Sequence, residues 1–222
     1  MRVEWQTALL GPALPNGEVH LWTAQVGDDP RNMDVLSEDE ETHAATFRFE
    51  EDRWRWVTSR ALLRLVLGRY LGSDPRLVEF ATVTRGRRIV RRPESSEWLS
   101  FSQARSGELC VVVVTRRSRI GVDLERVTPD HEFVAVARRA LGDDLAARLA
   151  TLPHERRIDE FYRAWVCEEA RGKCRGTGLV EPDDAARRLP LFVTELTIGE
   201  GYAGALASDT QPDAIRGHAA EL

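Results

Sequence analysis

The sequence predicts an α+β fold of two similar lobes in a pseudo-twofold arrangement, each with a small antiparallel sheet and packed helices. Three observations lead to this fold class. Strand-like alternation and helix-like spacing of apolar residues occur in both halves of the 222-residue chain. Each half contains one long helical stretch, at residues 53–71 and 158–174. Residues 109–115 are apolar up to the final threonine, which is typical of a central strand covered on both faces.

We expect residues 1–117 to form the N-terminal α+β lobe and residues 118–222 the C-terminal α+β lobe, which holds most of the candidate site residues. No sequence repeat relates the two halves, so the symmetry is expected in the structure alone.

The first lobe opens with alternating apolar and polar residues at 18–26, a strand pattern. Ser37, followed by three acidic residues, is typical of a helix start. The helix at residues 53–71 keeps its apolar side chains on one face, and the Gly72–Pro75 segment stops it. Further strands are predicted at residues 78–83, 89–90, 99–102 and 109–115, with residues 103–107 connecting the last two.

The second lobe begins with a strand at residues 120–125. Helices are expected at residues 133–141, 145–152 and 158–174, and strands at residues 192–198 and 202–207. The polar tail, residues 209–222, is predicted to be loose. His20, His131, His154 and His218 stand apart in the sequence and are interpreted as structural.

Composition indicates a cytoplasmic protein without a membrane or nucleic-acid partner. Hydrophobic residues make up 42% and charged residues 30% of the chain, as in soluble globular proteins. The longest apolar run, Leu109 to Val114, is far shorter than a membrane span. A net charge of −5 argues against a general nucleic-acid binder. The three cysteines fit neither a disulfide nor a zinc-ligand spacing.

The segment Gly121-Val122-Asp123-Leu124-Glu125 places two carboxylates two residues apart on a predicted strand, and hence on the same face. Carboxylates about 7 Å apart repel each other unless a cation lies between them. A hard divalent ion such as Mg²⁺ suits such oxygen ligands. The alternative is an acidic row that faces solvent.

A second candidate cluster lies on the last predicted helix. Phe161, Trp165, Glu169 and Lys173 are spaced by four and form one stripe, whose aromatic members indicate that it faces the core. Lys173 is the only lysine among 31 basic residues. A surface Glu–Lys pair is the alternative, but arginine would serve equally well there. A lysine offers a compact charge with an adjustable pKa, which suits contact with a phosphate beside a metal or proton transfer.

Arginines are dense in one further segment. Arg85, Arg87, Arg88, Arg91 and Arg92 fall within eight residues. They predict either a solvated hairpin or a site for a phosphorylated ligand.

These motifs together resemble a known family. GVDLE followed by W-x-x-x-E-A-x-x-K-x-x-G-x-G-L is similar to the paired signature of the 4′-phosphopantetheinyl transferases, in the monomeric two-lobed type that activates peptide and polyketide synthases. Residues 36–72 resemble the family's N-terminal helix region, and residues 201–207 resemble its last strand. Gly86-Arg87-Arg88 stands where the family often has Gly-Lys-Pro, and the segment FSQARSGEL where it has Phe-Asn-x-Ser-His-Ser.

The resemblance implies an enzyme that transfers the 4′-phosphopantetheine group of coenzyme A to a serine of an apo acyl or peptidyl carrier protein, releasing 3′,5′-ADP. It implies that Asp123, Glu125 and Glu169 hold Mg²⁺ on the pyrophosphate. Glu169, Lys173 and Asp123 would be the catalytic residues, with Glu169 taking the serine proton and Lys173 assisting the leaving group. The residues expected to bind coenzyme A are Arg55, Arg87, Arg105 and Lys173.

The sequence departs from the family pattern at several positions. Ala104 and Arg105 replace a Ser-His pair, and Glu168 replaces the usual lysine before the metal-binding glutamate. Glu40 and His43 stand where relatives often have basic residues. The alternatives are therefore a catalytically impaired relative that binds a carrier domain or a nucleotide without efficient transfer, and an unrelated α+β protein that binds a phosphorylated ligand.

Overall fold

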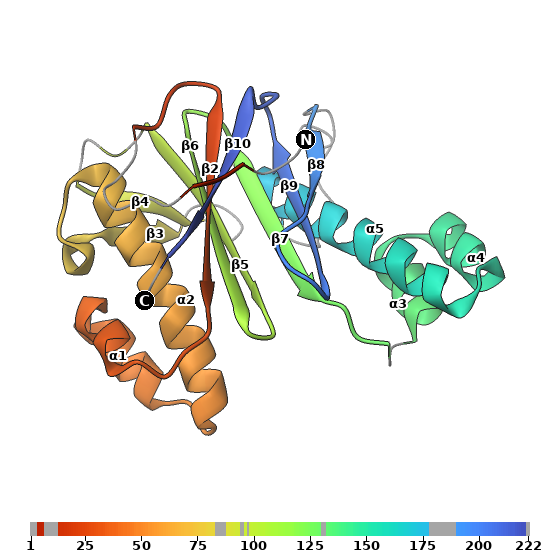
Figure 1. Cartoon of the computed structure of the whole chain (residues 1–222), viewed down its shortest axis with the longest axis horizontal. Helices are drawn as coiled ribbons and strands as arrows, with labels where there is room; N and C mark the ends of the chain where they lie inside the picture. Colours follow the sequence, from red (N-terminus) through yellow and green to blue (C-terminus); the bar gives the residue numbers. More distant parts are fainter. Residues whose placement is uncertain are drawn as a thin grey trace.

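The computed structural model describes residues 4–6 (backbone only), 13–82, 88–93, 96, 98–129, 132–177 and 190–220. The chain folds into two α+β units that lie side by side (Figure 1). The predicted α+β class is therefore confirmed. Within the described residues, no helix is long and apolar enough to cross a membrane.

The first sheet has the strand order β1-β10-β2-β6-β5. Its strands are β1 (Glu4–Gln6), β2 (Glu18–Gln25), β5 (Leu99–Ser106), β6 (Leu109–Arg116) and β10 (Ala214–Ala219). A separate two-stranded sheet pairs β3 (Glu79–Thr82) with β4 (Arg88–Arg92). Strand β6 lies between β2 and β5, as its apolar sequence predicts, because both of its faces are covered.

Helices cover one face of the first sheet. The 3₁₀ helix η1 (Pro30–Val35) and helix α1 (Glu38–Ala45) lead to the long helix α2 (Glu50–Leu71), and η2 (Pro75–Leu77) follows it. Ser37 and Glu40 form a capping box at the start of α1, as the sequence signal predicts. The buried face of α2 packs on β2 and β6; its core members here are Leu62, Leu63, Val66, Leu67, Trp22, Val112 and Val114.

The second sheet has the order β7-β9-β8, with β7 (Ile120–Arg126), β8 (Phe192–Leu196) and β9 (Tyr202–Ser208) all antiparallel. Helices α3 (Phe133–Ala140) and α4 (Asp143–Thr151) form a small pair beside the long helix α5 (His154–Arg175). Helix α5 packs on β7 and β9 through Val166, Ala170 and Cys174.

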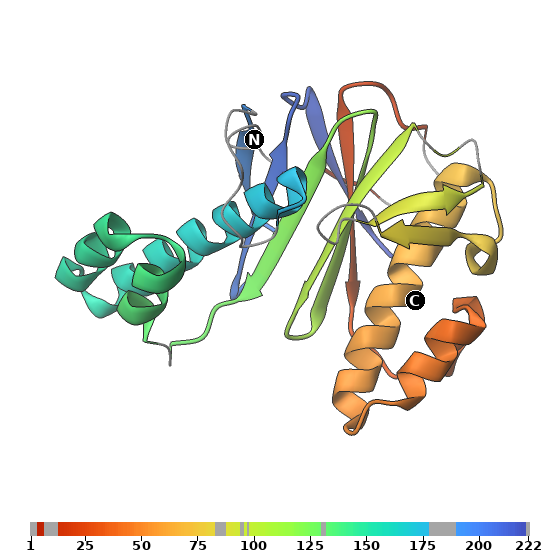
Figure 2. The same ribbon diagram turned by 180° about the vertical axis from the view of Figure 1, so that it is seen from behind.

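The two units share a core. One face of the first sheet packs on α2, and its other face packs on the inner face of the second sheet. The outer face of the second sheet packs on α5, so that α2 and α5 lie on opposite outer sides of the molecule (Figures 1 and 2). Both helices have 22 residues, and both end at a glycine with positive φ, Gly72 at +62° and Gly176 at +75°. These matching features fit the prediction of two similar lobes.

The prediction that the tail is loose is wrong for residues 214–219. These residues form β10, which runs parallel to β1 and β2 and makes the first sheet mixed rather than purely antiparallel. The guanidinium of Arg216 donates to the carboxylate of Glu18 at 2.8 and 3.1 Å, so a charged residue of the polar tail is paired within the sheet. Strand β10 belongs to the first sheet, although its residues fall within the predicted C-terminal lobe, residues 118–222. The division at residue 117 otherwise stays a prediction.

Two of the histidines that stand apart in the sequence contact each other in the fold. His218 on β10 stacks on Trp22 with ring centroids 4.6 Å apart, and the rings of His20 and His218 are 5.1 Å apart. This contact has no local signal in the sequence, because it depends on the parallel pairing of β2 and β10.

The prediction that residues 103–107 connect two strands is wrong for residues 103–106, because β5 extends to Ser106. The polar side chains that hide this strand are bonded to neighbouring elements. Gln103 donates to the hydroxyl of Ser59 on α2, and two serines of β5 bond to β7. A strand with polar side chains is not recognised from its hydrophobicity pattern when those side chains form hydrogen bonds with other elements.

Candidate active site

The candidate site lies at the seam where β5 of the first sheet runs beside β7 of the second. The two strands belong to different sheets, and serine hydroxyls bridge them. The backbone N–H of Val122 donates to Ser102 Oγ at 3.1 Å, and that of Arg126 donates to Ser106 Oγ at 3.0 Å. The seam thus places side chains of β7 within reach of both lobes.

Alternation along β7 divides its side chains between two faces. Val122 and Leu124 enter the shared core, while Asp123 and Glu125 point toward α5. Gly121 lies on the α5 side, and a Cβ there would lie 2.2 Å from the carbonyl oxygen of Ala170. The backbone of α5 therefore rests directly on β7, which requires glycine at this position.

This close approach brings Lys173 to Asp123. Lys173 Nζ lies 2.8 Å from Asp123 Oδ1, and it also approaches the carbonyl oxygen of Gln103 at 3.5 Å. Asp123 is buried, and its Oδ2 has no hydrogen-bond partner among the described residues. Burial raises the pKa of Asp123, although the ammonium of Lys173 works in the opposite direction. The Lys173 side chain keeps 31% of its surface exposed, so a ligand can reach it.

The other two carboxyl groups share this environment. Ser106 Oγ donates to Glu125 Oε2 at 2.7 Å. Burial raises the pKa of Glu125, and the charge of Asp123 raises it further. For Glu169 on α5, burial again raises the pKa most, followed by the charge of Asp123. The three carboxyl groups therefore lie within electrostatic reach of one another.

The carboxyl groups do not form a ready-made metal cage. In the part of the chain that the structure describes, no group of three His, Cys, Asp or Glu side chains is close enough to hold a metal ion. The ammonium of Lys173 is the cation that touches Asp123. The site thus combines an acidic cluster and one lysine, a set that can bind and polarise a phosphate ester with a divalent ion.

Of the arginines predicted to bind coenzyme A, Arg55 and Arg105 lie within the described residues. Arg55 on α2 pairs with Glu108 at the tip of the β5–β6 hairpin, at 2.9 Å. Arg105 is exposed on β5, and Arg87 lies outside the described residues. Arg92 is exposed and pairs loosely with Glu79 at 3.6 Å.

Comparison with known proteins decides the family. The model of the 4′-phosphopantetheinyl transferase superfamily matches residues 119–213. The chain is 35% identical over 178 residues to the 4′-phosphopantetheinyl transferase HetI of Nostoc sp., covering 77% of this chain and 74% of that protein. The chain belongs to the 4′-phosphopantetheinyl transferase family. A putative 4′-phosphopantetheinyl transferase of Synechocystis sp. is 28% identical over 167 residues, 75% of this chain and 67% of that protein.

A third relative, a phosphopantetheinyl transferase of Thraustochytrium sp., is 29% identical over 158 residues, 65% of this chain and 54% of that protein. The chain is therefore a transferase of this type, and the acidic cluster with Lys173 lies within the segment that the family model matches.

Packing explains two of the departures from the family pattern at the N-terminal side of this transferase. Glu40 pairs with Arg60 at 3.1 Å and with Arg64, so it anchors α1 to α2. The ring of His43 packs against Trp56, with centroids 4.9 Å apart. These two residues hold helices together, and their structural contacts account for their presence.

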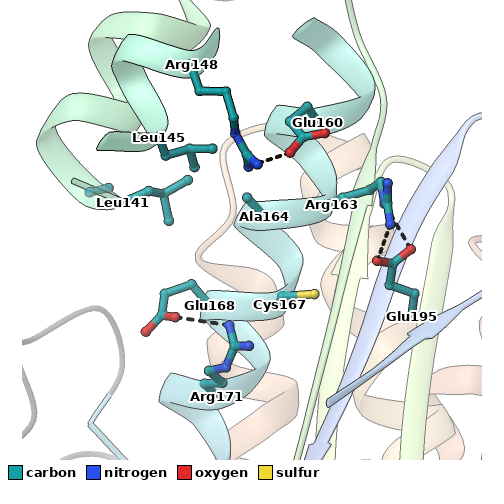
Figure 3. A pocket seen from close by; sticks show the side chains of 11 residues that line it. Leu141, Leu145, Arg148, Glu160, Arg163, Ala164, Cys167, Glu168, Arg171 and Glu195 are labelled. Atoms are coloured by element: carbon teal, nitrogen blue, oxygen red, sulfur yellow. Dashed lines mark hydrogen bonds and ion pairs between the residues drawn. The ribbon is translucent and has the colours of Figure 1, made fainter. Parts of the chain in front are cut away.

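The departures near the acidic cluster are also accounted for. Ala104 is a buried member of the core that the two units share. Glu168 pairs with Arg171 at 3.3 Å (Figure 3). It also approaches Arg175 at 4.0 Å. The negative charge of Glu168 is thus partly neutralised by residues of its own helix.

A hollow of about 590 Å³ between α4, α5 and β8 is a competing location for the site (Figure 3). Its arginines are each paired with a carboxylate: Arg148 with Glu160, Arg163 with Glu195, and Arg171 with Glu168. None of the acidic-cluster residues lies among the described residues that line it. Since none of the described residues lining this hollow belongs to the acidic cluster and its arginines already have carboxylate partners, the seam is kept as the candidate site.

Proposed function

We propose that this transferase moves the 4′-phosphopantetheine group of coenzyme A to a serine of an apo acyl or peptidyl carrier protein, with Mg²⁺ bound at the seam. The observation that carries the proposal is the contact of Lys173 with Asp123, beside Glu125 and Glu169, where the two units meet. Carriers of peptide and polyketide synthases are the expected partners, and a monomeric, cytoplasmic enzyme is the expectation from the sequence.

The residues at the seam fit Mg²⁺ in their chemistry. Mg²⁺ prefers carboxylate oxygens, and Asp123 offers a buried oxygen that has no partner among the described residues. Burial raises the pKa of Asp123, Glu125 and Glu169, so a bound cation would stabilise their ionised forms. These three residues would hold the ion, which would neutralise charge on the pyrophosphate.

The chain's own residues supply the proton transfers. Glu169 is half-buried with a raised pKa, which suits a group that accepts the proton of the attacking serine. As the serine oxygen bonds to the β-phosphorus, the bond from that phosphorus to the oxygen of 3′,5′-ADP breaks. Lys173 is held beside Asp123 with part of its surface exposed, so it can stabilise the charge on that leaving oxygen.

The predicted arginines would bind the phosphates of coenzyme A. Arg105 is exposed on β5 two residues beyond Gln103, whose carbonyl faces Lys173. Arg55 pairs with Glu108 at 2.9 Å and would have to release this contact to bind a phosphate. Arg87 keeps the same role as a prediction from the sequence.

The assay is an incubation of the protein with coenzyme A, Mg²⁺ and a panel of apo carrier proteins, read by intact mass. We expect at least one carrier to gain the mass of one phosphopantetheinyl group, and a Ser→Ala carrier to gain none. A chelator should stop the reaction. Coenzyme A binding without a mass gain on any carrier would contradict the proposal and favour an impaired relative.

A further inference from the structure

The hydroxyl of Ser106 links the first sheet to a carboxylate of the candidate site. Ser106 ends β5, and its Oγ donates to Glu125 Oε2 at 2.7 Å on β7 of the second sheet. The same oxygen accepts the backbone N–H of Arg126 at 3.0 Å. A serine hydroxyl has one proton, and the accepted N–H directs that proton toward the carboxylate.

Ser102 shows what a seam serine does without a carboxylate. It lies four residues earlier on the same face of β5, and its Oγ accepts the N–H of Val122 at 3.1 Å. Its hydrogen bond within the described structure is thus with the backbone of β7 alone. Both serines join the two sheets, but only the contact of Ser106 also orients a side chain of the acidic cluster.

The hydrogen bond from Ser106 holds the carboxylate of Glu125 from β5. Ser106 Oγ donates to Glu125 Oε2 at 2.7 Å. Hydrogen bonds to a charged acceptor are stronger than neutral ones, and this one restricts the rotamers of the side chain. A carboxylate that is already oriented loses less side-chain entropy when it takes up an ion.

We propose that Ser106 is a positioning residue that sets the orientation of Glu125 for a divalent cation. The inference rests on the proposed function, because it assumes that Glu125 ligates the ion. Ser106 acts through Glu125 and does not itself contact the ion or the substrate. It also makes the metal affinity depend on how β5 of the first sheet sits against β7.

The test compares Ser106→Ala, Ser106→Thr and the matched control Ser102→Ala. Mn²⁺ is the probe, and its binding in the presence of coenzyme A is measured from the loss of the free-ion signal in electron paramagnetic resonance. Partners that orient a metal ligand typically contribute 10–100-fold in metal affinity, so Ser106→Ala should bind Mn²⁺ at least about tenfold more weakly. Ser106→Thr keeps the hydroxyl and should recover most of that affinity.

Ser102→Ala should bind Mn²⁺ within about twofold of the parent, because it removes only a bridge between strands. Equal weakening by Ser102→Ala and Ser106→Ala would assign the effect to the seam and overturn the inference. Unchanged binding in Ser106→Ala, or no Mn²⁺ binding by the parent protein, would overturn it as well. A parent protein that binds Mn²⁺ with the predicted order of variants, yet modifies no carrier, would refute the proposed function alone.

Discussion

Gly121→Ala tests whether the contact between α5 and β7 positions the chemistry. Gly121 precedes the acidic pair of β7, and its backbone touches α5. An added Cβ would lie 2.2 Å from the carbonyl oxygen of Ala170 and 2.5 Å from the backbone nitrogen of Cys174. Both atoms belong to a helix backbone, so no change of rotamer can make room.

The size of the effect follows from these distances. An ordinary van der Waals contact begins near 3.4 Å, so α5 must retreat by about 1 Å. Lys173 and Glu169 would move with it, away from Asp123. A misplacement of about 1 Å can cost 10²-fold in rate, and we expect a loss of that size. Overpacking should also lower the free energy of unfolding by about 1–3 kcal/mol.

Gly204→Ala is the matched control. Gly204 is buried on β9 of the same sheet, where an added Cβ would meet the flexible Cδ1 of Ile198 at 2.8 Å. We expect this variant to keep its transfer rate within about threefold, because a side-chain end can move aside. Carrier modification by intact mass and urea unfolding would be measured for both variants, with rates expressed per folded protein.

A Gly121→Ala protein that folds and transfers as fast as Gly204→Ala would refute the reasoning, because the position of α5 would then not limit the reaction. A slow Gly121→Ala protein whose urea midpoint equals that of the control would still support it. In that case the shift of α5 affects the site rather than the overall stability.

Three further predictions concern single side chains. Lys173→Ala should lower carrier modification about a hundredfold, and Lys173→Arg should not restore it fully; full activity in Lys173→Arg would show that only positive charge is needed. Burial and the charge of Asp123 raise the pKa of Glu169, so its ionised form destabilises the ion-free fold as pH rises above the ordinary carboxyl value of 4.5. Glu169→Gln should therefore raise the melting temperature at neutral pH without metal and weaken Mn²⁺ binding; a lowered melting temperature would contradict this. Burial lowers the pKa of His20 below its ordinary 6.5, so the free energy of unfolding should decrease as pH falls below 6.5. His20→Gln should flatten that decrease, and identical pH slopes in the two proteins would exclude the role of His20.

Local sequence patterns were sufficient to predict most helices and strands of the fold. The strand predicted at residues 120–125 is β7, and the helix predicted at residues 158–174 lies within α5. The alternation in β7 also predicted that Asp123 and Glu125 share a face, and Lys173 contacts Asp123. Helix and strand periodicity fix the direction of a side chain once its element is known. That these side chains and Glu169 form one metal site stays a prediction.

The features that the sequence did not reveal depend on contacts between distant segments. Strand β10 pairs with β2 across almost the whole chain, where Arg216 bonds to Glu18 and the ring of His218 stacks on Trp22. The role of Ser106 depends on β5 and β7 lying side by side in two different sheets. No local pattern of apolar residues records such a contact.

The central claim, that the seam holds the reacting pyrophosphate through a divalent ion, is tested most directly by crystals grown with coenzyme A and Mn²⁺. Anomalous scattering locates Mn²⁺ without assumptions about the ligands. We expect one peak at about 2.1 Å from oxygens of Asp123, Glu125 and Glu169, with Lys173 Nζ on the pyrophosphate. A Mn²⁺ peak elsewhere in the molecule, with coenzyme A bound away from Lys173, would contradict the account.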